Sequence, residues 1–181
     1  MDEKILQLPE AVTISIERMM RFCYLAQMTM EQPDPQQGLL PTHLTRFGTL
    51  LLDTCSFLYS LFDDRRDSIH LARVWAGFDH PFYDALTAIE NRLQPFKPQL
   101  KLVRHRYGFH GSLSRTLEAE GFDILQDPLA GDLCTLIHDV KQLAVHMIAW
   151  HIDRMPCDHA ERGALLAAFK AELCGPGGSV A

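Results

Sequence analysis

The 181-residue sequence contains no long hydrophobic run. Its apolar stretches are broken within a few positions by a charged residue or a serine, whereas about 20 consecutive apolar residues are needed to span a bilayer. The first residues, Met1 to Lys4, also lack the basic flank and the small-residue cleavage site of a secretory signal peptide. We therefore expect a cytoplasmic protein that does not enter a membrane.

Cysteines are few and follow no pattern. Their odd number, five, and the lack of any C-x-x-C pair argue against a disulfide framework and against a zinc ribbon. Each lies in an apolar or helical context, so we expect buried free thiols. The cysteines are Cys23, Cys55, Cys134, Cys157 and Cys174.

The motifs of common enzyme classes are absent as well. The sequence has no P-loop, G-x-G-x-x-G, H-E-x-x-H or G-x-S-x-G, and no E-x-x-H of the kind that binds iron pairs in helical bundles. Histidines do gather between His138 and Asp153, but His146 and His151 diverge by about 140° on a helix. The sequence therefore predicts neither a metal site nor a cofactor.

The charge is unevenly distributed. With 17 basic and 23 acidic residues the net charge is −6, which argues against a protein that coats nucleic acid without specificity. The stretch from Arg92 to Arg115, however, holds six Lys or Arg and no Asp or Glu, so it carries +6 on a remainder of −12. We expect one basic face on an acidic body.

Apolar residues recur at steps of three and four through most of the chain, which indicates an all-α fold. The pattern predicts an antiparallel four- to five-helix bundle with short accessory helices, formed by one domain over residues 1–174, and a flexible tail over residues 175–181. Prolines 95 and 98 are expected to interrupt the middle of the chain. The expected helices cover residues 9–31, 41–62, 69–76, 81–93, 100–110, 112–120, 131–155 and 158–173.

Two of these helices show clear core stripes, and one shows a polar stripe. The polar stripe includes Asp53, Ser56 and Ser60, and it is read either as a solvated face or as one side of a reaction centre. The core stripes comprise Val12, Ile16, Met19, Met20, Cys23 and Met30 in the first helix, and Leu133, Leu136, Ile137, Val140, Ala144, Met147 and Ile148 in the last long one.

Basic residues and histidines crowd together between Leu100 and Ser112. A guanidinium such as that of Arg104 can bind two phosphate oxygens, and a histidine that titrates near neutrality can transfer a proton. His110 precedes Gly111 at a predicted helix end, where the helix dipole favours a protonated imidazole. The alternative is a basic helix end whose arginines pair with the acidic body and whose histidine caps carbonyls.

The pattern Arg104-His105-x-x-x-x-His110 resembles the R-polar-x(3–5)-H signature of the HEPN superfamily of all-α ribonucleases. The stretch from Ser56 to Asp63, with the following Arg65 to Ile69, is similar to the HEPN branch found in abortive-infection systems of phage defence. Together the two likenesses cover about residues 42–111. In the family, Asn or Asp often stands where this chain has His105.

The resemblance implies metal-independent RNA cleavage, in which the ribose 2′-hydroxyl attacks the adjacent phosphate. Arg104 would stabilise charge on the phosphate, His110 would be the acid and base, and His105 would orient it. It also implies a toxin or phage-defence effector, a homodimer and a possible antitoxin protein as partner. The alternatives are a catalytically silent HEPN-like module that binds RNA or a partner, and an unrelated bundle that binds a small ligand. From the charge pattern, the expected RNA-binding residues are Lys97, Lys101, Arg106 and Arg115.

Overall fold

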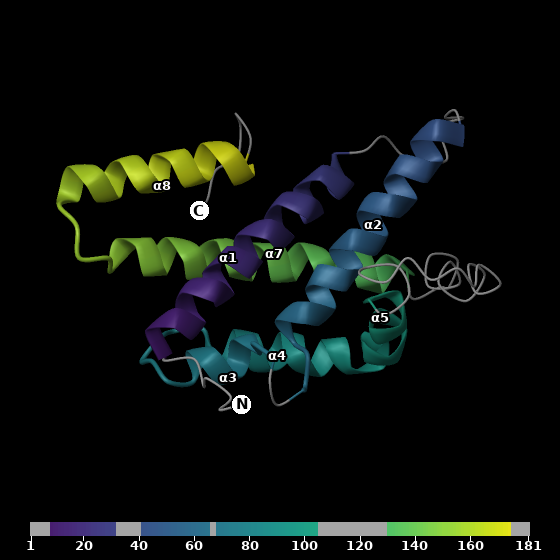
Figure 1. Cartoon of the computed structure of the whole chain (residues 1–181), viewed down its shortest axis with the longest axis horizontal. Coiled ribbons are helices and arrows are strands. Elements are labelled where there is room, and N and C mark those ends of the chain that lie inside the picture. The colour runs from purple at the N-terminus through teal and green to yellow at the C-terminus, as the bar shows by residue number, and fades with distance from the viewer. Residues whose placement is uncertain (1–7, 32–40, 66–67, 105–129, 175–181) are drawn as a thin grey trace, which may run out of the picture.

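Two antiparallel pairs of helices cross obliquely in this protein (Figure 1). One pair is α1 (Leu8–Met30) and α2 (Pro41–Leu61), and the other is α4 (Tyr83–Leu93) and α7 (Ala130–Asp153). The last helix, α8 (His159–Cys174), turns back along α7 and also contacts α1. The computed structural model describes residues 8–31, 41–65, 68–104 and 130–174, and within these ranges every regular element is a helix, which confirms the predicted all-α bundle.

Short elements connect the two pairs. Helix α3 (Leu71–Trp75) leads from the end of α2 toward α4, and a 3₁₀ turn, η1 (Gln94–Phe96), joins α4 to α5 (Lys97–Val103). The break in the helices at prolines 95 and 98 is shorter than predicted, because α5 begins at Lys97 and not at residue 100. Pro98 lies in the first turn of α5, where a missing N–H removes no intrahelical hydrogen bond.

The core lies where the two pairs cross. All seven apolar residues of the predicted α7 stripe are buried, as are Val12, Met19 and Cys23 of α1. Met30 contradicts the prediction, since it is 41% exposed. Thr29 takes the inward position at this end of α1, and its hydroxyl lies 3.0 Å from that of Thr54 on α2.

Polar contacts within the core tie α1 to three other helices. Besides the Thr29–Thr54 contact with α2, the indole Nε1 of Trp75 donates to the hydroxyl of Ser15 at 3.1 Å, which links α3 to α1. The buried Lys141 of α7 donates to the side-chain oxygen of Gln27 on α1. Buried donors and acceptors are costly when left unpaired, so these bonds fix how the helices are aligned.

An aromatic cluster fills the junction of α3, α4 and α7. The buried ring of Trp75 lies 6.0 Å from the ring of Trp150 on α7, and both contact Phe82 at the start of α4. His80 stacks on Phe82 and meets Trp75 edge to face. Such aromatic pairs add about 1 kcal/mol each beyond the area that they bury.

No helix in the described ranges is long and apolar enough to cross a membrane.

Candidate functional site

The turn that ends α2 is built around the carboxylate of Asp63, whose side chain is only 1% exposed. Its Oδ1 accepts the backbone N–H of Arg65 at 3.1 Å, and its Oδ2 accepts Nε of Arg65 at 2.9 Å. The Asp63 carbonyl accepts the hydroxyl of Ser68 and Nη2 of Arg73. An aspartate whose side chain accepts the backbone N–H two residues ahead commonly forms a turn. Here Arg65 bonds the carboxylate of Asp63, and Ser68 and Arg73 bond its carbonyl, so the residues that follow hold Asp63 in place.

Arg104 approaches the same carboxylate from the end of α5. Its Nη1 lies 3.4 Å from Oδ2 of Asp63, and its guanidinium carbon is 5.7 Å from the ring centre of Tyr59, within cation–π range. The Arg104 side chain is 18% exposed. Its Nη1 is buried and makes no hydrogen bond to any residue of the described ranges. Arg104 Nη1 therefore faces the Asp63 carboxylate as an ion pair without a well-formed hydrogen bond.

Two guanidinium groups, those of Arg65 and Arg104, pair with this carboxylate, and the charge of Asp63 also reaches Arg18. The pKa of Arg18 on α1 is lowered, first by burial and then by the charge of Arg104, while the charge of Asp63 acts in the opposite direction. Burial by itself would raise the pKa of Asp63, but the hydrogen bonds from Arg65 and the positive charges of Arg65 and Arg104 bring it below its usual value. We call Asp63, Arg18, Arg65 and Arg104 the Asp63 cluster; it has an excess of positive charge.

The other predicted RNA-binding residues have different surroundings. Nζ of Lys97 lies 2.8 Å from each carboxylate oxygen of Asp64. Arg92, which belongs to the same basic stretch, bonds Asp139 of α7 at 2.6 Å. Lys101 is exposed and makes no ion pair with a described residue. Four of the predicted site residues lie outside the described ranges: His105, Arg106, His110 and Arg115.

Part of the basic stretch thus fits the alternative interpretation, in which its basic side chains pair with acidic residues of the protein. Arg92, Lys97 and Arg104 each pair with an aspartate from another part of the chain. Within the described part of the stretch, Lys101 is the basic side chain left to solvent. Pairing by acidic neighbours weakens the attraction of Lys97 for a phosphate, since its ammonium already has two acceptors.

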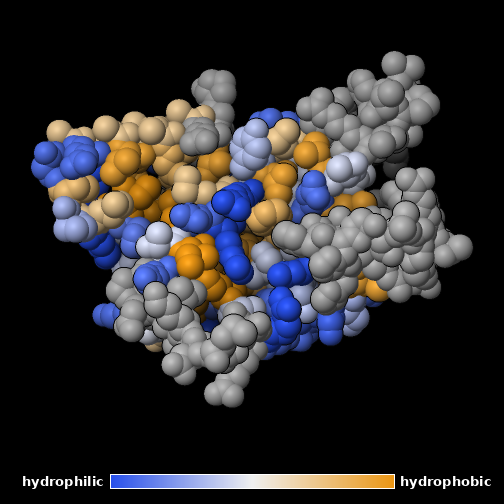
Figure 2. Space-filling view, viewed as in Figure 1, coloured by the Kyte–Doolittle hydropathy of each residue, from blue (hydrophilic) through white to orange (hydrophobic). Residues whose placement is uncertain are grey.

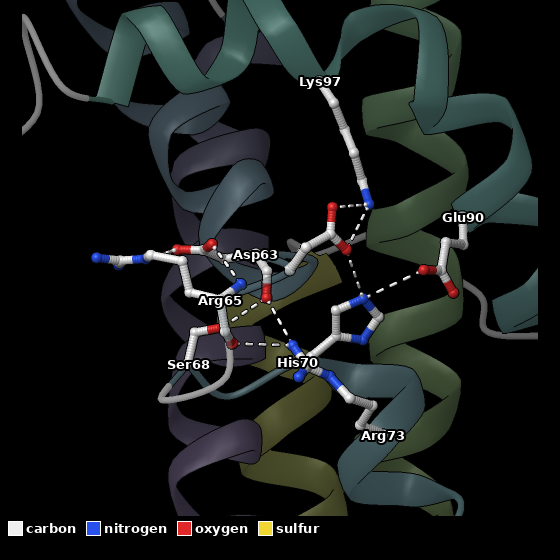
Figure 3. A network of polar contacts seen from close by, with 8 residues as sticks. Asp63, Arg65, Ser68, His70, Arg73, Glu90 and Lys97 are labelled. Atoms are coloured by element: carbon white, nitrogen blue, oxygen red, sulfur yellow. Dashed lines mark hydrogen bonds and ion pairs between the residues drawn. The ribbon is translucent and has the colours of Figure 1, made fainter.

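A second polar group, around His70, was not predicted from the sequence (Figure 3). The His70 side chain is 4% exposed, and its Nε2 lies 3.2 Å from Oε1 of Glu90 and 3.6 Å from Oδ1 of Asp64. Burial lowers the pKa of His70, with Glu90 acting in the opposite direction. These three side chains line a cavity of about 450 Å³ together with Tyr83 and Thr87. His70 and Glu90 are 20 residues apart on different elements, so no spacing motif announces them.

The polar stripe of α2 does not form a uniform face. Ser56 is buried, against the solvated interpretation, whereas Asp53 is partly exposed and burial raises its pKa. Ser60 donates its hydroxyl to the carbonyl of Phe57 at 2.7 Å. These serines and Asp53 therefore do not meet as a reaction centre.

An open groove of about 690 Å³ lies between α1, α2 and α8. Met20 and Tyr24 of α1, Phe57 of α2 and Leu173 of α8 contribute apolar lining, and charged residues of α1 border it. Figure 2 shows hydrophobic and hydrophilic residues side by side on one face of the molecule. The groove is a surface feature of the bundle and holds no convergent set of reactive groups.

No protein-family model, curated protein or solved structure matches this chain. Any functional conclusion therefore rests on the Asp63 cluster, the His70 group and the residues that follow Arg104.

Proposed function

We propose that the chain is a HEPN-type, metal-independent endoribonuclease in which Arg104 stabilises the scissile phosphate. One observation carries this proposal: the guanidinium groups of Arg65 and Arg104 both pair with the single buried carboxylate of Asp63, and Arg104 directly precedes the segment that holds His105 and His110. A phosphodiester is a natural partner for guanidinium groups gathered at one place, because arginine binds phosphate oxygens bidentately.

The proposed reaction needs no group beyond the RNA and side chains of the protein. The 2′-oxygen of a ribose loses its proton to a base, attacks the adjacent phosphorus and displaces the 5′-oxygen of the next nucleotide, which takes up a proton. His110 would transfer these protons, His105 would orient it, and Arg104 would stabilise the charge that develops on the phosphate. The products are a 2′,3′-cyclic phosphate and a 5′-hydroxyl.

Asp63 has a positioning role in this scheme. Its buried carboxylate and the Tyr59 ring hold the guanidinium of Arg104 in one place, so the side chain need not be ordered when RNA binds.

A second function is favoured by the same ion pair. Because Asp63 and Tyr59 already engage Arg104, the arginine can also be a purely structural residue. The chain would then be a catalytically silent HEPN-like module that binds RNA or a partner protein without cleaving anything.

Cleavage in EDTA separates the two functions. We expect the purified protein to cut single-stranded RNA in the presence of EDTA, and the products to carry 2′,3′-cyclic phosphate or 3′-phosphate and 5′-hydroxyl ends. His110→Ala should abolish cleavage, whereas His146→Ala, which changes an exposed histidine of α7, should not. RNA that is bound but never cut would favour the silent module. Cleavage of a substrate with a 2′-deoxy nucleotide at the scissile position would contradict the proposed chemistry.

The proposed biological role is that of a toxin or phage-defence effector. An endoribonuclease of this kind would arrest growth when produced alone in a bacterial cell, and an antitoxin partner would relieve the arrest. Induced expression of the wild-type chain should therefore stop colony formation, and His110→Ala should restore it at equal protein level. Arrest by both chains would separate toxicity from catalysis.

A further inference from the structure

We propose that Asp64, His70 and Glu90 form a binding site for a divalent metal ion of the zinc class, located where the end of α2, the start of α3 and the middle of α4 meet. One ligand atom from each residue lies within 4.8 Å of the other two. Figure 3 shows the His70 ring pointing toward Glu90 and toward the carboxylate that Lys97 holds. This site is separate from the proposed chemistry at Arg104, and its binding is measured without RNA.

The ligand set suits an ion of this class. One imidazole nitrogen and two carboxylate oxygens give three protein ligands, which is the usual number at a zinc site that keeps a position open for water. The 450 Å³ cavity lined by these residues, with Tyr83 and Thr87 on its wall, provides room for that water. Asp64 is 68% exposed, so its carboxylate can move the short distance needed for coordination.

His70 supplies the independent sign that a cation belongs here. Its buried Nδ1 has no hydrogen-bond partner among the described residues, while Nε2 faces two carboxylate oxygens. A neutral imidazole carries one N–H and one lone pair. If the proton is on Nδ1, three atoms with lone pairs face one another; if it is on Nε2, the Nδ1 lone pair is buried without a donor. A cation at Nε2 removes the first conflict, and the remaining Nδ1–H is the group that a metal-bound histidine ordinarily donates to a carboxylate, a carbonyl or a water.

Lys97 is the cation that competes for this site. Its ammonium bonds both oxygens of Asp64, so a metal ion must displace it before all three ligands can bind. Two consequences follow. Binding to the wild-type chain is weaker than the ligand set alone would give, and removal of the ammonium strengthens it.

Cobalt(II) titration of the full chain tests the site, because tetrahedral and five-coordinate Co²⁺ absorb visible light intensely and Zn²⁺ displaces it without absorbing. We expect one saturable Co²⁺ site per chain with no sulfur-to-cobalt band, reversed by Zn²⁺. His70→Gln and Glu90→Gln should each weaken binding by about tenfold or more, since changing even a residue that only hydrogen-bonds to a metal ligand lowers metal affinity about 10- to 100-fold. Lys97→Met should strengthen it. His146→Gln, at an exposed position of α7, is the matched control and should bind as the wild type does.

The alternatives give different results. Equal affinity for wild type, His70→Gln and Glu90→Gln would mean that Co²⁺ binds only to surface histidines or thiols and would overturn the site, as would weaker binding in Lys97→Met. Thermal unfolding of each variant establishes that it is folded. If His70→Gln does not fold, Glu90→Gln, at a partly exposed position, still decides. RNA cleavage in EDTA is read separately, so failure of the metal site and failure of the nuclease are distinguishable.

Discussion

Asp63 does two things at once, since it ends α2 through its bonds to Arg65 and holds Arg104 from α5. Removing the charge of one partner in a buried pair leaves the other charge without compensation. We therefore expect Asp63→Asn to lower the free energy of unfolding by about 3 kcal/mol, measured by urea denaturation. Asp64→Asn is the control, because this neighbour is largely exposed and should cost about 1 kcal/mol or less. Equal effects of the two substitutions would contradict the structural role of Asp63.

The depressed pKa of Asp63 predicts a pH dependence with a definite sign. The ionised carboxylate is stabilised in the folded protein, so its contribution is complete above the unfolded pKa of about 3.9 and is lost as the pH falls through the lower folded pKa. The stability difference between the wild type and Asp63→Asn should be constant from pH 7 to about pH 5 and should shrink below pH 4. A difference that persists unchanged to pH 2 would show that the charge of Asp63 is not its source.

Lys97 and Lys101 should no longer be treated as equivalent contacts for RNA. Lys101 is exposed and makes no ion pair within the described ranges, while Lys97 is bonded to Asp64. Lys101→Gln should weaken RNA binding and lower the slope of log K against log salt by up to about 1, the loss of one phosphate contact. Lys97→Gln should change the slope less. An unchanged slope in Lys101→Gln would place the RNA on another face.

At the scale of elements, the contact between Ser15 of α1 and Trp75 of α3 offers a test of how these helices are aligned. Ser15→Ala leaves the buried indole N–H without its acceptor, which should cost about 1–3 kcal/mol. In a Trp75→Phe background the same change should cost much less, because no donor remains. Urea denaturation of the four chains gives the coupling energy. A coupling near zero would mean that the bond does not help to align α1 and α3.

The elements themselves were largely predictable from the sequence. Helix α7 shows why: its apolar residues repeat in register from Leu133 to Ile148, about four turns, so the stripe has one possible inward face. Predictions were weakest where tertiary contacts override local preference. At the end of α1 the inward position belongs to Thr29, which pairs with Thr54, and Met30 is exposed although it is the more hydrophobic residue. The sequence predicts that Pro98 breaks a helix, because a proline is tolerated only in the first turn and the sequence does not show where α5 starts.

The site was predictable only in part. A short motif indicates Arg104, but nothing local indicates that its partner is Asp63, 41 residues earlier in the turn after α2. Asp63 belongs to a turn rich in charge, and the sequence does not tell which of its carboxylates is buried. His70, Glu90 and Lys97 come together only because α3 packs against α4 and α5 packs against α2. Contacts of this kind depend on the packing of whole helices and leave no spacing pattern.

At the scale of the whole molecule, the six-residue spacing of Arg104 and His110 leaves three ways to bring both to one phosphate: a distortion at Gly108, the reach of the arginine side chain, or a two-fold dimer, which we favour. On a regular helix, residues six apart point about 120° away from each other and lie about 9 Å apart along the axis. A two-fold homodimer in which Arg104 of one protomer serves His110 of its partner would bring the two groups to one phosphate. His110 lies outside the described ranges, so the dimer stays a prediction.

Mixed dimers test this arrangement. Coexpressed Arg104→Ala and His110→Ala chains with different tags should form heterodimers with one complete site of two, while each mutant homodimer is inactive. Random pairing makes half of the dimers mixed, so the unfractionated mixture should reach at most about a quarter of wild-type activity. A purified heterodimer as inactive as either parent would show that the site lies within a single chain.

The aromatic junction of α3, α4 and α7 also determines what light can report about this protein. Both of its tryptophans lie there with ring centres 6.0 Å apart, and the guanidinium of Arg154 covers Trp150 at 4.0 Å. Excitation of either indole is therefore shared with the other, and the ultraviolet emission of the whole chain arises from one place. A shift of that emission to longer wavelength signals that the junction of α3, α4 and α7 has opened to water. Stopped-flow fluorescence would thus time the formation of this junction.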